Sequence, residues 1–139
     1  MDTAAGQRPS LLLVEENHSI MAPLRDWLSM VFPSIRLIEA TDQAEGISLN
    51  RSQRPDVVLM DISTLGRRGV DRVHSMKAVR PAGAVLALVT LESEVLQREL
   101  LRAGAEGCTS LSQLRTEMLP LLKKHLGTEA ETVPAVAGS

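Results

Sequence analysis

The chain has 139 residues, of which 44% are hydrophobic and 23% charged, and its formal net charge is -2. This length and balance are typical of one globular domain and give no sign of a basic surface built to hold nucleic-acid phosphates. The single cysteine excludes an internal disulfide, and no apolar run approaches the roughly 18 residues of a membrane span. Because the first ten residues hold no apolar signal core, we expect a cytoplasmic protein.

Strand-like apolar runs alternate with helix-like segments along the whole chain. We expect residues 1–9 to be a disordered lead and residues 127–139 to be a flexible tail or linker. The predicted strands are residues 11–15, 35–40, 57–60, 84–89 and 107–110. The predicted helices run from His18 or Ser19 to Val31, from a cap at Thr41 or Asp42 to about Ser52, from Val70 to Val79, from Glu92 or Ser93 to Ala103, and from Ser112 to Leu126.

The strands differ in how deeply we expect them to be buried. Residues 57–60 and 84–89 are continuous apolar runs, which is typical of central strands covered on both faces. Residues 35–40 alternate apolar and polar side chains, which favours a strand at the edge or exposed on one face. The strand at 107–110 is predicted mainly from its place in the alternation.

Glycine and proline positions predict where helices end or change direction. In the second helix, Ala44 and Ile47 are predicted to face inward, with Leu49 as a further candidate, and Gly46 is predicted to weaken the helix. Gly104 is the predicted stop of the fourth helix. Pro120 lies inside the last helical segment, so we expect either a kink there or a late start with Thr116 as the cap.

Strict alternation of strands and helices predicts one parallel sheet with helices on both faces. In such sheets, ligands bind at the carboxyl ends of the strands. Glu15 and Glu16 stand at the end of the first strand, and Asp61 directly follows the third. If these strands are neighbours, three carboxylates meet in one crevice.

The chain resembles the receiver domains of two-component response regulators. The resemblance rests on the acidic pair Glu15-Glu16, on Asp61 after the third strand, on Thr90 after the fourth, and on the segment 104–107 before the fifth. It covers roughly residues 10–126. It implies an α/β fold of three layers, a doubly wound, flavodoxin-like sheet of five parallel strands in the order 2-1-3-4-5.

The family resemblance also implies a chemistry. Asp61 matches the aspartate that accepts a phosphoryl group from a sensor histidine kinase or a small phosphodonor, and Thr90 matches the hydroxyl that contacts this group. Glu15, Glu16, Asp61 and the backbone carbonyl of Ser63 match the ligands of one Mg²⁺ ion. These are hard oxygen donors, the kind that Mg²⁺ prefers. We therefore expect a signalling phosphoacceptor and no enzyme.

Two departures from the family pattern favour an alternative. The usual lysine after the fifth strand, which contacts the phosphoryl group, is Leu111 here, and the usual aromatic residue of the fifth strand is Cys108. Arg67 and Arg68, in the loop after Asp61, could supply a substitute cation. The alternative is an atypical receiver that binds protein partners without phosphorylation. A small enzyme on this fold is a third hypothesis, which lacks support because the chain has no glycine-rich phosphate loop.

Receivers commonly pair through their fourth helix, fifth strand and fifth helix. Here that surface would include Val95, Leu100 and Cys108, so a homodimer is one expected partner state. We expect no membrane partner and no direct nucleic-acid binding by this domain, although an attached effector could bind DNA.

Overall fold

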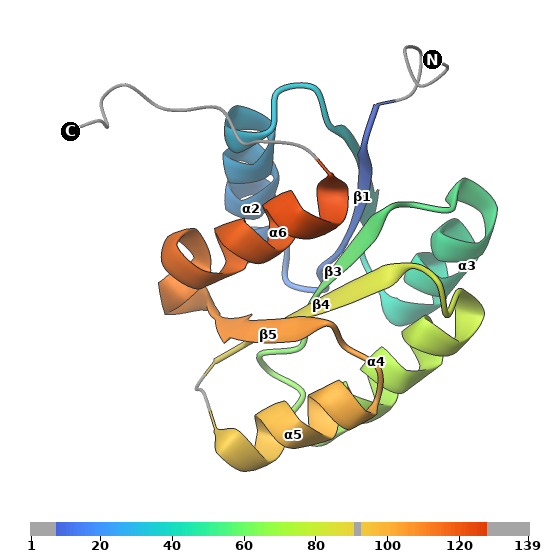
Figure 1. The fold of residues 1–139 in the computed structure, drawn as a ribbon, viewed down its shortest axis with the longest axis vertical. Coiled ribbons are helices and arrows are strands. Elements are labelled where there is room, and N and C mark those ends of the chain that lie inside the picture. The colour runs from blue at the N-terminus through green and yellow to red at the C-terminus, as the bar shows by residue number, and fades with distance from the viewer. Residues whose placement is uncertain (1–7, 91–92, 128–139) are drawn as a thin grey trace.

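The computed structural model describes residues 8–90 and 93–127, and Figure 1 shows their arrangement in three layers. Five parallel strands form one sheet in the order β2-β1-β3-β4-β5, as the resemblance implied. The strands are β1 (Ser10–Val14), β2 (Arg36–Ala40), β3 (Val57–Asp61), β4 (Ala84–Val89) and β5 (Gly107–Ser110). The α-helices are α2 (His18–Val31), α3 (Gln43–Gln53), α4 (Arg68–Val79), α5 (Glu94–Arg102) and α6 (Leu119–Leu126).

The sheet is covered on both faces, which explains the continuous apolar runs of its central strands. Leu11 and Leu13 point to the side of α2 and α6, whereas Leu12 and Val14 point to the side of α3, α4 and α5. The two cores are separate because successive side chains of a strand face opposite ways. The strand β2 lies at the sheet edge and is only half-buried over most of its length, as its alternating sequence predicted.

Polar side chains begin three of the helices close to the predicted positions. Asn17 caps α2 by accepting a hydrogen bond from the Ser19 amide, Asp42 caps α3, and Ser93 caps α5. Each supplies an acceptor for a backbone N–H group that the first turn of a helix leaves without a partner. Gly104 follows α5 with φ of +113° and so ends the helix, as expected.

The inward face of α3 agrees with the prediction at Ile47 and Leu49, which pack against the core, and differs from it at Ala44. Ala44 is exposed, and the buried residues of the helix are Gly46 and Asn50. A Cβ on Gly46 would lie 3.0 Å from Cγ2 of Val14, so this glycine lets α3 approach the sheet closely. Gly46 therefore has a packing role that its helix propensity alone does not reveal.

The segment before α6 is less regular than one helix from Ser112. It contains a 3-10 turn (Leu111–Gln113) and a π-helical turn (Leu114–Met118) before α6 begins at Leu119. The late start predicted from Pro120 is confirmed, because proline is tolerated in the first turn of a helix. Thr116 is not the cap; its hydroxyl donates to the carbonyl of Gln113 instead.

Some sequence predictions fall partly outside the described residues. These are the lead before Arg8, the tail after Gly127 and the alternative helix start at Glu92.

The expected pairing surface is wrong at Leu100. This residue is fully buried, so it contributes nothing to an exposed surface. Among the helices that the structure describes, none is both long and apolar enough to cross a bilayer.

Candidate functional site

The carboxyl ends of β1, β3 and β4 bring the predicted site residues to one edge of the sheet. Val14 pairs with Met60 in the β1–β3 register, so Glu15 follows β1 beside Asp61, the last residue of β3. Thr90 directly follows β4, the next strand along. The approach of Glu15, Asp61 and Thr90 therefore follows from the strand order.

Glu15 is the buried member of this group, with 3% of its surface exposed. One carboxyl oxygen, Oε2, accepts a hydrogen bond of 3.0 Å from the amide of Asn17. The other, Oε1, has no donor among the described residues. The pKa of Glu15 is raised from 4.5 to about 8, mainly by burial and secondly by a hydrogen bond with Asp61. The raised pKa favours a neutral Glu15 carboxyl at pH 7, which relieves its repulsion with Asp61.

Asp61, Ser63 and Thr90 form a hydrogen-bonded chain across two strand ends. The amide of Ser63 donates to Oδ1 of Asp61 at 2.9 Å and fixes the carboxylate. The hydroxyl of Thr90 donates to the carbonyl of Ser63 at 2.6 Å. This carbonyl is the predicted backbone metal ligand. Thr90 is therefore connected to the loop after Asp61 in the structure.

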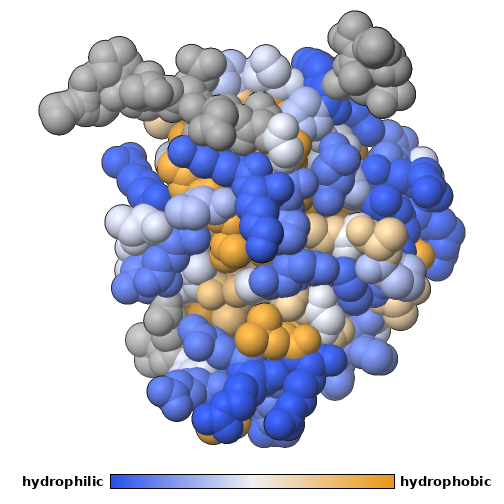
Figure 2. Space-filling view, viewed as in Figure 1, coloured by the Kyte–Doolittle hydropathy of each residue, from blue (hydrophilic) through white to orange (hydrophobic). Residues whose placement is uncertain are grey.

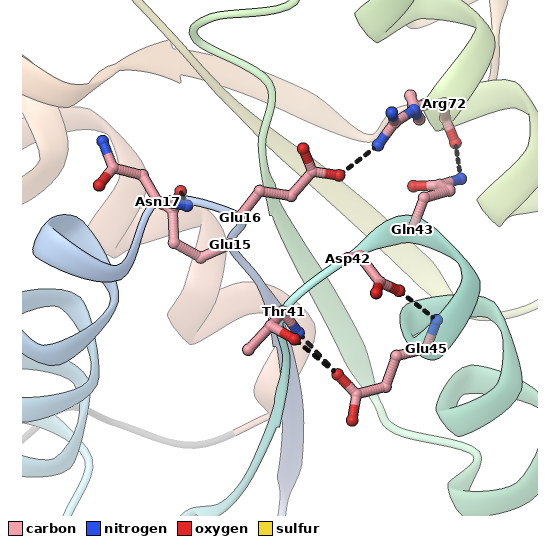
Figure 3. Close-up of polar contacts among 8 residues, drawn as sticks. All are labelled: Glu15, Glu16, Asn17, Thr41, Asp42, Gln43, Glu45 and Arg72. Carbon is pink, nitrogen blue, oxygen red and sulfur yellow. Dashed lines mark hydrogen bonds and ion pairs between the residues drawn. The ribbon is translucent and has the colours of Figure 1, made fainter.

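Glu16 lies apart from the other two acids. Its carboxylate accepts a bond of 2.6 Å from Nη1 of Arg72 on α4 (Figure 3). Gln43, in the first turn of α3, donates to the backbone carbonyl of Arg72 at 3.1 Å. The acidic pair thus divides: Glu15 turns toward Asp61, and Glu16 turns toward an arginine from another element.

The donor set can be compared with the requirements of Mg²⁺. Glu15 Oε1 is a buried acceptor without a donor, Asp61 lies next to it, and the carbonyl of Ser63 has a second lone pair beyond the one used by Thr90. These oxygens fit the ion chemically. Glu16 would have to leave Arg72 to join them. Accordingly, no group of three or more His, Cys, Asp or Glu side chains in the described part of the chain is arranged for a metal ion as it stands.

The cation expected beside the phosphoryl group is absent from its usual place. Leu111 follows β5 next to Thr90, because Val89 pairs with Ser110, and it packs half-buried against the core. Arg67 forms an ion pair of 3.4 Å with Glu99 on α5. Together with Arg68, it lines a hollow of about 490 Å³ between α4 and α5.

Arg72 is the crevice residue that sequence reasoning missed. It lies one helical turn after Arg68, one of the two arginines that the sequence offers as a substitute cation. Arg72 and Glu16 are 56 residues apart in the sequence, so the local pattern of residues cannot reveal their contact. The only available signal was the i, i+4 spacing of Arg68 and Arg72 on a helix that begins just after the Asp61 loop.

Comparison with known proteins gives a consistent result. The family model of the response regulator receiver domain matches residues 11–118. The chain is 25% identical over 130 residues to the response regulator GacA of Pseudomonas syringae pv. syringae (strain B728a), covering 91% of this chain and 59% of GacA. It is 24% identical over 104 residues to the nitrate/nitrite response regulator NarL of Escherichia coli (strain K12), covering 74% of this chain and 48% of NarL. The chain thus spans about half to three fifths of these relatives.

Solved structures share the fold. The signal receiver domain of the putative response regulator NarL from Mycobacterium tuberculosis superposes with a TM-score of 0.74 at 20% identity, covering 87% of this chain and 98% of that one. A receiver domain of a DNA-binding response regulator from Colwellia psychrerythraea 34H gives a TM-score of 0.74 at 21% identity, covering 86% and 99%.

Proposed function

Because the chain belongs to the response regulator receiver domain family of two-component signalling, we propose that it is a phosphoryl-accepting switch with Asp61 as the acceptor. The observation that carries the proposal is the meeting of Glu15, Asp61 and Thr90 at adjacent strand ends. This edge of a doubly wound sheet is where such folds place their ligands.

In the proposed step, a carboxylate oxygen of Asp61 attacks the phosphorus of a phosphodonor. A new P–O bond forms, the bond from phosphorus to the donor's leaving group breaks, and the leaving group keeps the electron pair. The Ser63 amide holds Oδ1 of Asp61 and leaves Oδ2 to attack. A bound Mg²⁺ would supply positive charge that offsets the repulsion between carboxylate and phosphoryl oxygens.

Glu15, Asp61 and the Ser63 carbonyl are the residues that would hold this ion, with Glu16 joining them after release from Arg72. Glu15 must give up its proton to do so, because a metal ligand has to be deprotonated. Thr90 would turn its hydroxyl from the Ser63 carbonyl toward the phosphoryl oxygens. That movement would transmit the modification to the end of β4.

The test is intact mass after incubation with acetyl phosphate, with and without Mg²⁺. We expect an adduct of one phosphoryl group that requires Mg²⁺, is lost in Asp61→Asn, and persists in Asp71→Asn. Asp71 is a suitable control because it is an exposed aspartate on the neighbouring helix α4. Absence of an adduct in the folded wild-type protein at high donor concentration would remove the switch function. It would direct attention to a receiver that binds partners without phosphorylation.

The proposed partners follow from the same function. A sensor histidine kinase or a small phosphodonor would supply the phosphoryl group. Homodimers would form through the face made by α5, β5 and α6. Figure 2 shows this face in the view of Figure 1, with hydrophobic areas lying among hydrophilic ones. Val95 and Leu101 of α5 are 58% and 51% exposed. An effector attached beyond this domain would carry any DNA binding.

A further inference from the structure

The structure gives Glu16, one of the three crevice acids, a charge partner without a metal ion. Glu16 is bound to Arg72 at 2.6 Å. The Arg72 and Glu16 side chains are 29% and 44% exposed, so the pair lies partly out of water. An ion pair in this setting is screened less than one on an open surface.

Arg72 is held in place from its backbone as well as its side chain. Gln43 of α3 donates to the Arg72 carbonyl, and Arg72 in turn reaches the end of β1 (Figure 3). The guanidinium therefore extends from a fixed point on α4 to the acidic pair. Arg67 and Arg68 have no such contact with Glu16; Arg67 binds Glu99 instead.

We propose that Arg72 is a positioning residue that holds Glu16 out of the metal-ligand set and so weakens divalent-cation binding to the crevice. The proposal rests on the proposed function, because it concerns the same Mg²⁺ site. A cation that recruits Glu16 must break the Arg72–Glu16 bond, and it also meets the positive charge of the guanidinium. Both effects lower its affinity.

The expected size of the effect follows from the exposure of the pair. Removing the competitor should tighten Mg²⁺ binding about fivefold, which corresponds to about 1 kcal/mol. This value lies at the upper end for solvent-exposed ion pairs. The effect should require Glu16, because without its carboxylate there is nothing for Arg72 to withhold.

The experiment measures Mg²⁺ binding by isothermal titration calorimetry, at the same pH for every variant. The test variant is Arg72→Met, which keeps an apolar stem and removes the charge. Arg68→Met is the matched control, since Arg68 is an exposed arginine of the same helix. Glu16→Gln and the double variant complete a cycle. Circular dichroism checks that each variant is folded.

We expect about fivefold tighter binding in Arg72→Met, an unchanged affinity in Arg68→Met, and no gain from Arg72→Met when Glu16 is glutamine. Mg²⁺ binding by the variant but not by the wild type would support the proposal in its strongest form. Equal or weaker affinity in folded Arg72→Met would overturn it. If the wild type still forms the Asp61 adduct with Mg²⁺, that result leaves the proposed function intact. If neither protein binds Mg²⁺, both proposals fail.

Discussion

The buried carboxyl of Glu15 makes the stability of this protein depend on pH. Its pKa is raised from 4.5 to about 8 by burial and by its hydrogen bond with Asp61. Between these two values the folded protein keeps a proton that the unfolded chain has released. The stabilisation is complete below pH 4.5 and is lost as the pH rises through about 8.

Glu15→Gln should therefore flatten the pH dependence of the unfolding free energy. Glutamine is a neutral side chain of the same shape, so it keeps the protonated form's contacts at every pH. One pKa unit corresponds to about 1.4 kcal/mol, and allowing for solvent screening we expect a wild-type loss from this group of about 2 kcal/mol between pH 5 and 8. Urea unfolding of both proteins without metal measures it. Parallel pH profiles would contradict the argument.

Leu111 is the second residue whose replacement is informative. Leu111→Lys places a cation beside Thr90 at the position where the family resemblance implies one. A charge-assisted hydrogen bond of this kind contributes roughly 1.5–3 kcal/mol, so we expect at least tenfold more phosphoryl adduct at a subsaturating level of acetyl phosphate. The half-buried stem of lysine can replace much of the leucine packing.

Intact mass after a fixed incubation measures this gain. Leu114→Lys is the control, because Leu114 is another half-buried leucine of the same segment but does not directly follow β5. Equal amounts of adduct in wild type and Leu111→Lys would show that a cation at this place contributes nothing.

At this scale, prediction from sequence works for residues whose position is set by a strand end. Glu15, Asp61 and Thr90 follow apolar strands, and parallel strands end at the same sheet edge, so their approach was predictable. The direction in which a side chain points cannot be predicted in the same way. Glu15 and Glu16 are chemically identical, yet burial raises the pKa of the first, and an arginine distant in sequence binds the second.

At the scale of elements, the turn from α5 into β5 depends on Gly104. Its φ of +113° is strained for any other residue, and a Cβ would lie 2.6 Å from Cγ of Lys77. Lys77 cannot easily move, since it donates to the Gly83 carbonyl and pairs with Glu106. Gly104→Ala should therefore destabilise the fold by about 2–3 kcal/mol.

Gly127→Ala separates the two causes of this loss. Gly127 also follows a helix with positive φ, +68°, but a Cβ there would meet nothing within 4 Å. We expect it to cost about 1 kcal/mol, the backbone strain alone. The two values come from urea unfolding. A loss in Gly104→Ala no greater than that in Gly127→Ala would mean that Lys77 gives way freely.

Most elements could be predicted because their signals are local. Short apolar runs form the buried strands, and Asn17, Asp42 and Ser93 cap the helices that follow them. The segment from Leu111 to Met118 could not. Its residues fit one helical pattern, but they form a 3-10 turn and a π-helical turn in which Leu111 and Leu114 pack against the core.

At the scale of the whole molecule, the architecture follows from the alternation of strands and helices and from the covering of both sheet faces by helices. Strict alternation of strands and helices predicts a parallel sheet, whereas the order 2-1-3-4-5 came from the family resemblance. Which side chains stay exposed on the folded surface was harder to predict from the sequence. Leu100 and Leu101 are adjacent leucines, and only packing decides that the first is fully buried while the second is 51% exposed.

The exposed side chains of α5 lead to the last prediction, which concerns association of whole molecules. If the proposed dimer forms through α5, β5 and α6, then Val95→Asp places a charge in an apolar contact. We expect the dimer dissociation constant to rise about tenfold, or about 1.4 kcal/mol. Met30→Asp is the matched control, because Met30 is 55% exposed against 58% for Val95 but lies on α2.

Sedimentation equilibrium with and without acetyl phosphate and Mg²⁺ would measure these constants. If phosphorylation promotes pairing, the wild type and Met30→Asp should shift equally toward the dimer. The dimer fraction of Val95→Asp should increase less than that of either protein. The comparison works because both substitutions replace an exposed apolar residue by the same charge, so their effects on solubility match. An equal shift in all three proteins would place the contact elsewhere on the surface, away from the α5 face.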